Sequence, residues 1–532
     1  MSDQSKPSPD QIDSEFRWQL PGTFNFATDV VDRWASDPDR LALIAENADG
    51  DLDTLSYADV SLRSCQLANL LRDHGIKQGD RVIVMLPRIP QWQIAMVAVL
   101  RLGAVPIPCI TMLMPKDLAY RAEHSGAAGV ITLASECHKL ESIPGLVTRI
   151  CVGEAPDGWT SLAEADAQPE ACANVEVGID DPAIIYYTSG STGLPKGVTH
   201  ASRALWAWQS SAEHWLDLGP KDRIWCTADT GWSKAGTSIL FGPWSRGAAV
   251  LFYDGPFEPA KRFELLARHK INCFCAAATE LRQLVLEDAT GYDLSSLRQT
   301  VSAGESVNPE ILTRWKALTG TSVLDGYGQT ETLMTITNRP DRPVKAGSMG
   351  RPLPGIEIAV RTAEGEAQSS SALGELLIGL PNPQVMLGYW QDPKRTEAAR
   401  LEIDGREWFA TGDNVEIDKD GYVFFTGRAD DIINSSGYRI GPQEVENALS
   451  GHPSVKECAV VGIPDDTRGE LVKAWIILKG GFDASEELVV ELQNHVKSTT
   501  APYKYPRRIA FTDELPKTVT GKIRRNVLRE RN

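Results

Sequence analysis

The sequence has no regular arrangement of cysteines and no excess of positive charge. Its 9 cysteines are scattered from Cys65 to Cys458, without a CxxC pair and without histidines at the spacing of metal ligands. This pattern excludes a disulfide framework and indicates a reducing, cytoplasmic compartment. The formal net charge of -17 argues against a general binder of nucleic acid or of anionic membranes. An anionic ligand would therefore have to be held by a local group of residues.

An uninterrupted apolar run long enough to span a bilayer is also missing. The most apolar region, residues 93–114, is broken by Arg101, Pro106 and Pro108, so it predicts a buried helix followed by a strand. Residues 1–16 are polar and acidic, with neither the apolar core of a signal peptide nor an Arg-rich amphipathic pattern. We expect a flexible tail there and no contact with a membrane.

Short apolar runs alternate with helical patterns along most of the 532 residues. This alternation predicts an α/β protein with parallel sheets covered by helices. After residue 430 the order changes to helix, strand, strand and helix, which predicts a small α+β domain of about a hundred residues. We therefore predict a tail over 1–16, a large N-terminal domain over 17–429 and a C-terminal domain over 430–532. The runs expected as strands are 81–86, 128–133, 248–253 and 271–277, and those expected as helices include 57–75 and 260–270.

One loop, "YYTSGSTGLPKGVTH" at residues 186–200, is rich in glycine and hydroxyl side chains. Its glycines permit a backbone that turns successive N–H groups to one side, and such a nest suits phosphate oxygens. Lys196 supplies a positive charge, but the spacing differs from the Walker motif because a glycine follows the lysine. A flexible Gly/Ser linker is the alternative. The apolar "PAIIYY" just before the loop and the Pro-Lys pair inside it argue against a linker.

Three further stretches carry polar side chains that suit a nucleotide. "DGYGQTET" (325–332) offers the Thr330 hydroxyl for a phosphate and the Glu331 carboxylate for Mg²⁺. "WFATGDNVEID" (408–418) places Asp413 just after a predicted strand, where a carboxylate can accept both hydroxyls of a ribose. "GRADDIINSSGYRIGPQEVE" (427–446) is a connector rich in turns. Taken singly, each could equally be a tight turn, a strand cap or a charged linker.

In this order, the four stretches and "PKTVTGKIRR" (516–525) resemble the adenylate-forming superfamily of acyl-CoA synthetases, luciferases and peptide-synthetase adenylation domains. "DTGWSKAG" (229–236) and "SAGESVNPE" (302–310) are most similar to the medium-chain acyl-CoA synthetases. The resemblance implies a large N-terminal domain of layered, mostly parallel sheets with helices. It also implies a small mobile α+β C-terminal domain that rotates between two half-reactions.

The resemblance also implies roles for individual residues. Thr330 would contact the α-phosphate, Glu331 would ligate Mg²⁺, and Lys522 would drive adenylation together with Lys196. Asp430 would be the hinge. The residues expected to bind coenzyme A are Ser436, Gly437, Tyr438 and Arg439. Those expected to bind ATP or AMP are Thr188, Ser189, Gly190, Ser191, Thr192, Gly193, Lys196, Gly304, Glu305, Ser306, Asp325, Gly326, Tyr327, Gln329, Thr330, Asp413, Arg428 and Lys522.

The implied activity is an ATP-dependent ligation of a carboxylic acid to coenzyme A through an acyl-adenylate, with AMP and pyrophosphate as products. The acid is already ionised, so the residues must neutralise charge and position anions rather than act as a general base. The segment 501–532 agrees with this, because it carries nine Lys or Arg against three Asp or Glu. A solubilising helix end is the alternative, but local attraction of anions suits an acidic protein that handles ATP and coenzyme A better.

The preferred acid is less well indicated. In acetate-activating relatives a tryptophan stands where this chain has Gly328, so we expect a more open pocket for a medium-chain, branched or aromatic acid. Trp232 and Ala303 are the other expected pocket residues, although Trp232 could equally be core. Glu280 departs from the pattern of medium-chain relatives, which leaves a polar acid open. For His200, just past the loop, a structural role is the simpler expectation.

Two other functions remain open at this point. The chain could load a separate carrier protein, although it ends soon after Lys522 without an appended carrier domain. It could instead be a non-catalytic nucleotide sensor, but such a protein would have little reason to keep Lys196, Glu331, Asp413 and Lys522 together. The expected partners are the small-molecule acid, ATP with Mg²⁺, and coenzyme A, with no nucleic acid. A homo-oligomer is compatible with the composition.

Overall fold

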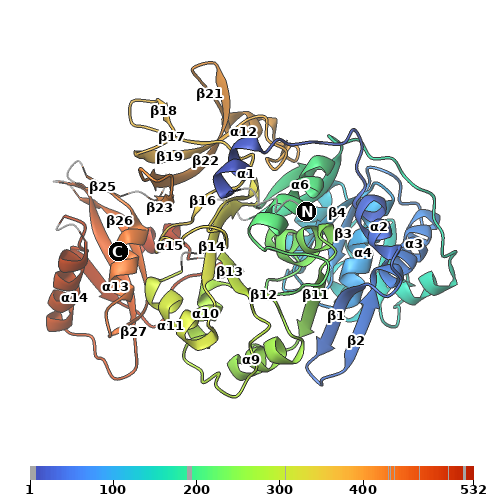
Figure 1. Cartoon of the computed structure of the whole chain (residues 1–532), viewed down its shortest axis with the longest axis horizontal. Helices are drawn as coiled ribbons and strands as arrows, with labels where there is room; N and C mark the ends of the chain where they lie inside the picture. The colour runs from blue at the N-terminus through green and yellow to red at the C-terminus, as the bar shows by residue number, and fades with distance from the viewer. Residues whose placement is uncertain are drawn as a thin grey trace, which may run out of the picture. The chain divides into compact units, whose positions relative to one another are not determined.

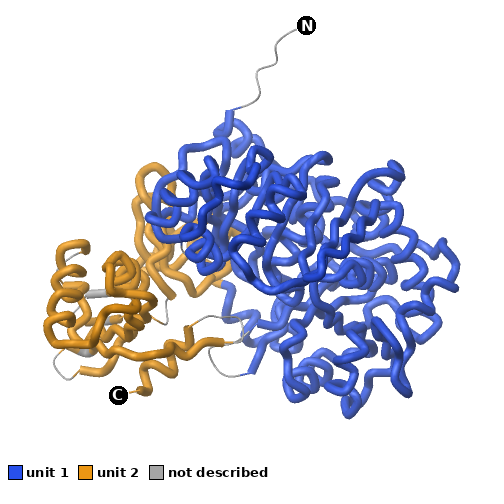
Figure 2. The backbone as a smooth tube through the Cα atoms, turned by 90° about the horizontal axis from the view of Figure 1, so that it is seen from below, with its two compact units in different colours: residues 1–357, 380–400 blue, residues 358–379, 401–532 orange. Residues whose placement is uncertain are grey.

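The structure is a computed structural model, and it describes residues 8–188, 194–305, 307–428, 431, 433–435, 438–465, 468–500, 503–518 and 523–531. The chain divides into two compact units (Figure 2). The first contains residues 1–357 and 380–400, and the second contains residues 358–379 and 401–532. The predicted domain boundary at residue 430 stays a prediction, because residues 429, 430 and 432 lie outside the described residues.

A nine-stranded sheet is the largest sheet of the first unit (Figure 1). Six neighbouring strands in its middle run parallel, as the buried apolar runs predicted. Their carboxyl ends therefore meet at one edge of the sheet. Across the sheet the strands are β16 (Arg351–Pro352), β15 (Leu333–Thr337), β14 (Val323–Gln329), β13 (Gln299–Ala303), β12 (Cys273–Cys275), β10 (Arg223–Cys226), β11 (Ala249–Asp254), β1 (Leu41–Asn47) and β2 (Leu52–Ser56).

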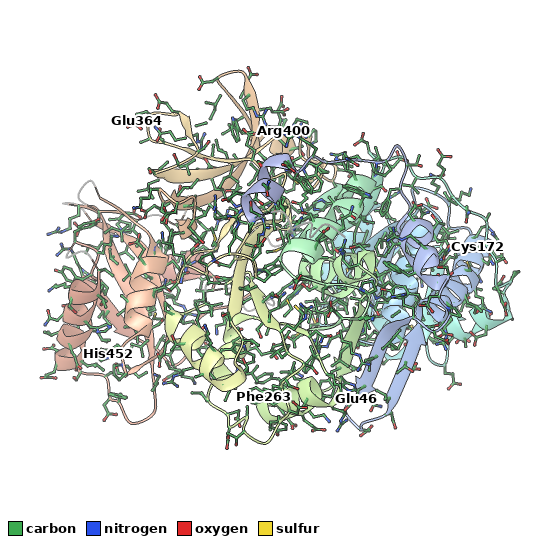
Figure 3. The ribbon with its side chains drawn as sticks, viewed as in Figure 1. Glu46, Cys172, Phe263, Glu364, Arg400 and His452 are labelled. Carbon is green, nitrogen blue, oxygen red and sulfur yellow. The ribbon has the colours of Figure 1, made fainter. Side chains whose placement is uncertain are left out.

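Three helices pack on this sheet, and stacked aromatic rings join two of them, α9 (Pro259–Arg268) and α11 (Pro309–Thr319). Phe263, labelled in Figure 3, lies 6.0 Å from the ring of Tyr292 and 6.1 Å from that of Trp315. Trp315 also stacks on Phe274 of β12 at 6.1 Å. Rings of this size contribute much of the apolar area that a core buries. The third helix is α10 (Ala278–Leu284).

A second, fully parallel sheet confirms the helix and strand predicted over residues 93–114. These residues form most of α4 (Pro90–Arg101) and all of β4 (Val105–Pro108). Arg101 is buried at the end of α4 and donates to Asp32 at 2.8 Å. Among the described residues, no helix combines the length and apolarity that crossing a bilayer requires. The other strands, in order from β4, are β3 (Arg81–Met85), β5 (Gly129–Leu133), β6 (Thr148–Val152) and β7 (Thr160–Ser161), and further helices are α3 (Tyr57–Asp73) and α5 (Pro115–Ser125).

The glycine-rich loop lies between two strands of a three-stranded sheet. β8 (Pro182–Thr188) and β9 (Lys196–Ala201) are antiparallel, and Thr188 pairs directly with Lys196. The strand expected at "PAIIYY" is thus confirmed. Residues 189–193, which connect the two strands, lie outside the described residues. The third strand, β20 (Gly388–Tyr389), pairs with β9, and α6 (Ser202–His214) follows β9.

Helix α1 (Pro9–Glu15) corrects the prediction of a flexible tail over residues 1–16. A capping box that begins at Ser8 satisfies the first turn of the helix. Asp13 then accepts a hydrogen bond from Arg339 at 2.5 Å, 326 residues further along the chain. Arg339 is almost fully buried, so this ion pair fixes the helix to the first unit (Figure 1). Local polarity in the sequence could not reveal so distant a partner.

The second unit begins with an antiparallel sheet. Residues 408–417 lie in its longest strand, β22 (Arg406–Ile417), which pairs with β19 and β23. The alternating buried and exposed residues of β19 and β22 are typical of such a sheet. Its strands are β18 (Ala367–Gln368), β17 (Ile358–Arg361), β19 (Ala372–Gly379), β22 (Arg406–Ile417), β21 (Arg400–Ile403) and β23 (Val423–Arg428).

The rest of the second unit has the helix, strand, strand and helix predicted after residue 430. α13 (Pro442–Ser450) and α14 (Glu486–Thr499) enclose the apolar face of a five-stranded sheet. The predicted fold class, α/β with a small α+β C-terminal part, is confirmed. The strands are β25 (Tyr438–Ile440), β24 (Ile433–Ser435), β27 (Gly469–Leu478), β26 (Val455–Asp465) and β28 (Arg508–Phe511), and α15 (Arg525–Glu530) is the last helix.

Candidate functional site

Lys196, Glu331 and Tyr389 form a compact polar cluster in the first unit. The Lys196 ammonium donates to Oε1 of Glu331 at 2.7 Å and to the Tyr389 hydroxyl at 2.8 Å. The Tyr389 hydroxyl donates in turn to the same Oε1 at 2.9 Å. Lys196 begins β9, Glu331 lies in the turn after β14, and Tyr389 ends β20. Three separate parts of the chain therefore meet around one carboxylate oxygen.

The charge on Glu331 is maintained inside the protein. Burial opposes its ionisation, because only 8% of the residue is exposed. The Lys196 ammonium and the Tyr389 hydroxyl outweigh that effect and hold the pKa of Glu331 below its usual value. The cluster therefore presents an ionised carboxylate and an ammonium side by side at neutral pH.

Backbone hydrogen bonds explain why Tyr389 belongs to this cluster. The N–H of Met386 donates to the carbonyl of Glu331 at 2.8 Å, and the N–H of Leu387 donates to that of Thr199 at 2.8 Å. The segment before Tyr389 is thus bonded to the turn that carries Glu331 and to β9, which carries Lys196. We did not predict Tyr389 from the sequence, because no local pattern distinguishes the tyrosine of "LGYWQ".

His200 and Ser233 position Thr330. Burial lowers the pKa of His200 to about 4, so the ring is neutral. Its Nε2 lies 2.6 Å from the carbonyl oxygen of Thr330, and in the neutral ring it must donate to that oxygen. The Thr330 hydroxyl lies 3.3 Å from that of Ser233, which begins α7 (Ser233–Ala235). His200 thus has the structural role that was the simpler expectation.

The carboxyl ends of β13 and β14 bring together several residues expected to bind the nucleotide. Ala303 pairs with Gly326 and Ser302 with Asp325 in this parallel pair of strands. Gly304 follows with a φ of 93°, a left-handed conformation that favours glycine. In open α/β sheets, ligands bind at such carboxyl ends. Glu305, Tyr327 and Gln329 lie in the same two strand ends, whereas Ser306 is outside the described residues.

Two buried ionisable side chains, Asp325 and Lys234, lie at this edge. Burial raises the pKa of Asp325 to about 7. Hydrogen bonds from the Gly326 and Val307 N–H groups partly offset this rise. Lys234, in "SKAG", donates from Nζ to the carbonyl oxygen of Ala303 at 3.2 Å. The edge thus contains a carboxyl group that titrates near neutral pH, which is unusual outside functional sites.

The position of Gly328 is set by the close approach of two strands. A Cβ atom on Gly328 would lie 1.9 Å from the carbonyl oxygen of Leu333 on β15. A bulge between Tyr327 and Gly328 brings the two backbones this close. The approach of the strands therefore requires a glycine here, and the expectation that Gly328 leaves the acyl pocket open stays a prediction.

Trp232 lies at the edge of a hydrophobic core, where it could also line the expected acyl pocket. It is partly exposed and packs against the core of the parallel sheet that contains β3 and β4. Its Nε1 has no hydrogen-bond partner among the described residues. The preceding Gly231 lies so close to Ile110 that a Cβ atom there would be 2.4 Å from its backbone nitrogen. This contact fixes where Trp232 lies.

Asp413 and Arg428 are brought together within the second unit. They are direct cross-strand partners on β22 and β23, with Oδ1 and an arginine nitrogen 3.6 Å apart. Asp413 is buried, while 48% of the Arg428 side chain is exposed. The two residues expected to bind the ribose thus share one end of a strand pair.

Comparison with known proteins identifies the family. The model of the AMP-binding enzymes matches residues 30–390, and the model of their C-terminal domain matches residues 444–522. The chain belongs to the AMP-binding enzymes. The family match includes the hairpin of β8 and β9 and the cluster around Glu331.

Relatives place this AMP-binding enzyme among the acyl-CoA synthetases, which are acid–thiol ligases. It is 39% identical to human mitochondrial acyl-coenzyme A synthetase ACSM3, over 98% of this chain and 92% of that protein. It is 40% identical to the uncharacterised acyl–CoA ligase YtcI of Bacillus subtilis, over 96% of each. A crystal structure of the anthranilate CoA ligase AuaEII with anthranoyl-AMP superposes with a TM-score of 0.86, at 31% identity, over 96% of this chain and 98% of the other.

Several expected site residues of this AMP-binding enzyme lie outside the described residues. For Tyr438 and Arg439 the backbone is described as part of β25. The described residues contain no group of three or more His, Cys, Asp or Glu that could hold a metal. Mg²⁺ is commonly bound through one or two carboxylates plus substrate phosphates. The single carboxylate of Glu331 therefore suits Mg²⁺. The residues outside are Ser189, Gly190, Ser191, Thr192, Gly193, Ser306, Asp430, Ser436, Gly437 and Lys522.

Proposed function

We propose that this acyl-CoA synthetase converts a carboxylic acid and ATP into an acyl-adenylate and then transfers the acyl group to coenzyme A. The carboxylate oxygen attacks the α-phosphorus, and the bond to the β-phosphate oxygen breaks, so pyrophosphate leaves. The thiol of coenzyme A then attacks the acyl carbon, and AMP leaves. The cluster of Lys196, Glu331 and Tyr389 is the observation that carries this proposal.

Neutralising anions is the main task in the first step, because the acid is ionised and ATP is highly charged. Without a nucleotide, Lys196 and Glu331 are each other's partners. With MgATP, Lys196 would turn to a phosphate oxygen, and Glu331 would help to hold Mg²⁺, which neutralises phosphate charge. Thr330, oriented by His200, would donate its hydroxyl to the α-phosphate.

The other nucleotide contacts are those expected from the resemblance. Asp413 would accept the ribose hydroxyls, and its partner Arg428 would keep the carboxylate ionised and oriented. Gly304, Glu305, Asp325 and Tyr327 would flank the adenine, with the other residues expected from the resemblance around the phosphates. Solved relatives support ATP as the substrate, since MatB from Rhodopseudomonas palustris, 28% identical, was crystallised with ATP bound.

The second step would use different residues. Lys522 would serve adenylation, and the 436–439 segment would approach coenzyme A after rotation about Asp430. A thiol with a reference pKa of about 8.5 is sufficiently ionised near neutral pH to attack a mixed anhydride with little help. All nine cysteines of the chain are free, which supports a reducing, cytoplasmic compartment.

The acid we propose has an apolar body, either medium-chain, branched or aromatic. Trp232 and Ala303 would line its site, beside the segment that holds Thr330. Aromatic acids gain support from two solved relatives, the anthranilate CoA ligase and a benzoate CoA ligase from Burkholderia xenovorans, each 31% identical. Gly328, which has no side chain, would leave this site open.

AMP release across a panel of short, medium, branched and aromatic acids tests the proposal. We expect one group of acids to give AMP that depends on coenzyme A, with acyl-CoA formed in equal amount. AMP formation that needs a carrier protein instead would show that the acyl acceptor is wrong. ATP–pyrophosphate exchange that stays at background with every acid would show that the chain is not an adenylating enzyme.

A further inference from the structure

A cavity of about 310 Å³ opens beside the Lys196 cluster. Its polar lining residues are Tyr120 and His124 of α5, Lys196 and Tyr389, and Asp392 and Arg395 at the start of α12 (Pro393–Ala398). All of these residues belong to the first unit. The volume is at the lower end of that of small-molecule sites. Lys196 belongs both to this cavity and to the cluster around Glu331.

We propose that the cavity is a subsite for a diphosphate group, with Arg395 and His124 as its anion-binding residues. The diphosphate is either the terminal part of bound ATP or the pyrophosphate after its release. This inference rests on the proposed adenylation and extends it to residues that carry no family motif.

Arg395 is a cation with spare hydrogen-bonding capacity. Among the described residues, its only ion-pair partner is Asp392, at 3.5 Å. That carboxylate is already engaged at the start of the helix, where it accepts from the N–H of Arg395 at 3.0 Å. The guanidinium has five donors, and its planar fork matches phosphate oxygens. Since 42% of the side chain is exposed, it can turn toward an anion at little cost.

Arg395 and Lys196 both lie close to the ring of Tyr389. The Lys196 ammonium is 4.4 Å from the ring centroid, and the guanidinium carbon of Arg395 is 5.8 Å from it. Two positive charges therefore flank one aromatic side chain at the cavity wall. Their mutual repulsion favours an anion between or beside them, and a diphosphate can contact both.

His124 adds a neutral donor. Its Nδ1 lies 2.7 Å from the Tyr187 hydroxyl, and its ring stacks on Tyr120 at 5.3 Å. Burial lowers the pKa of His124, so the ring carries one proton. The Tyr187 hydroxyl has a second acceptor, the carbonyl oxygen of Arg121 at 3.5 Å. In the tautomer that the subsite requires, this hydroxyl donates to Nδ1 and the proton is on Nε2, which has no hydrogen bond among the described residues. Tyr120 also donates to the carbonyl of Pro195 at 2.9 Å, which ties this wall to the chain entering Lys196.

The test compares Arg395→Ala with Lys394→Ala in the full-length protein. Lys394 is the exposed neighbour of Arg395 and does not line the cavity, so the two variants lose the same charge one residue apart. The measurements are inhibition by pyrophosphate in competition with ATP, and direct binding of ATP. We expect Arg395→Ala to weaken pyrophosphate inhibition about three- to tenfold. Lys394→Ala should leave this inhibition unchanged, and Arg395→Lys should retain part of it.

The two sources of the diphosphate give different results. If only pyrophosphate inhibition weakens, the cavity holds the released product. If ATP binding weakens equally, it holds the terminal phosphates of ATP. His124→Gln, which keeps a donor, should retain more pyrophosphate affinity than His124→Ala.

Pyrophosphate exchange by the native protein distinguishes failure of this inference from failure of the proposed function. If the native protein exchanges pyrophosphate with ATP and Arg395→Ala matches it in both measurements, the subsite is wrong and the function stands. If the native protein shows no exchange with any acid, the proposed function is wrong first. Thioester formation from a synthetic acyl-adenylate and coenzyme A should be the same in all of these variants, and a matching loss there would mean that Arg395→Ala acts through the fold.

Discussion

The ammonium of Lys196 lies 2.7 Å from Oε1 of Glu331, across 135 residues of sequence. The two charges are largely buried, with 22% and 10% of their side chains exposed. An isolated charge at this depth would be costly, so each residue stabilises the ionised form of the other. When MgATP binds, two new contacts would replace this ion pair. Lys196 would contact a phosphate oxygen, and Glu331 would contact the metal ion.

Replacing Lys196 should affect chemistry more than folding. In Lys196→Ala, we expect the rate of acyl-adenylate formation to fall about 10²–10³-fold, because a preorganised charge at the phosphates is lost. Lys116→Ala, at an exposed position of α5, is the matched control. Rates are measured by ATP–pyrophosphate exchange. A loss below about threefold would mean that Lys196 does not serve the reaction, since a small surface effect would account for it.

Glu331→Gln should raise the Mg²⁺ concentration needed for half-maximal activity. The amide keeps the size of the side chain but loses the charge that attracts the cation. Tyr389→Phe should change the Mg²⁺ requirement less, because the carboxylate remains ionised beside Lys196. The measurement is a Mg²⁺ titration of AMP release, with Glu310→Gln on the exposed surface of α11 as the control. Identical titration curves for Glu331→Gln and the native protein would contradict this assignment.

Lys522→Ala should separate the two half-reactions. The rate of adenylation should fall about 10²–10³-fold, as expected for Lys196→Ala, because each variant loses a positive charge at the reacting phosphates. Thioester formation from a synthetic acyl-adenylate and coenzyme A should stay near the native rate. Equal losses in both steps would show that Lys522 has a general structural role instead.

Asp325 should make stability depend on pH. Its pKa is about 7 in the folded protein against 3.8 as its ordinary value, so the folded state retains a proton that the unfolded chain loses. The stabilisation is fully present below about pH 4 and is lost as the pH rises through about 7. Asp325→Asn should therefore gain stability relative to the native protein over this interval.

The measurement for Asp325 is the difference in Tm between native and variant proteins from pH 4 to 8. The effects of other titrating groups on stability cancel in this difference. His200 is one of them, because its lowered pKa makes the folded protein less stable as the pH falls below about 6. A difference that does not change with pH would show that Asp325 is ionised throughout the range.

Cys65 and Cys172 should form a disulfide when the protein is oxidised. Their sulfur atoms lie 3.0 Å apart, and the hydrogen bond between the two thiols, with Arg101 nearby, lowers the pKa of Cys172, which is labelled in Figure 3. Oxidised glutathione would accept the two electrons and two protons and become two reduced molecules. Mass spectrometry of the unreduced protein should then find the two peptides linked. Cys172→Ser should abolish the link, and oxidation that leaves both thiols free would contradict the prediction.

Much of the secondary structure followed from local patterns. The apolar run broken by Arg101 and two prolines predicted both α4 and β4, and "PAIIYY" predicted β8. Such patterns succeed because a helix or strand is set largely by the spacing of apolar residues within one short segment. The glycine-rich loop and the stretches at 325–332 and 408–418 likewise indicated the family, because each motif is contiguous.

Contacts between distant segments were beyond that reasoning. Tyr389 meets Lys196 across 193 residues and His200 meets Thr330 across 130. No feature near Asp13 in the sequence indicated Arg339, so α1 was expected to be a flexible tail. Nor did the sequence show that the carbonyl of Leu333 approaches the place where a Cβ atom on Gly328 would lie.

The sequence by itself determined the fold class, the family and the chemical groups of the site, since these depend on residue type and order. Only the tertiary structure decided which of these groups meet. The hairpin of β8 and β9, the strand β20 and the turn after β14 must all pack together before Lys196, Tyr389 and Glu331 can share one oxygen. That packing depends on backbone hydrogen bonds between strands far apart in the chain, and no local pattern encodes them.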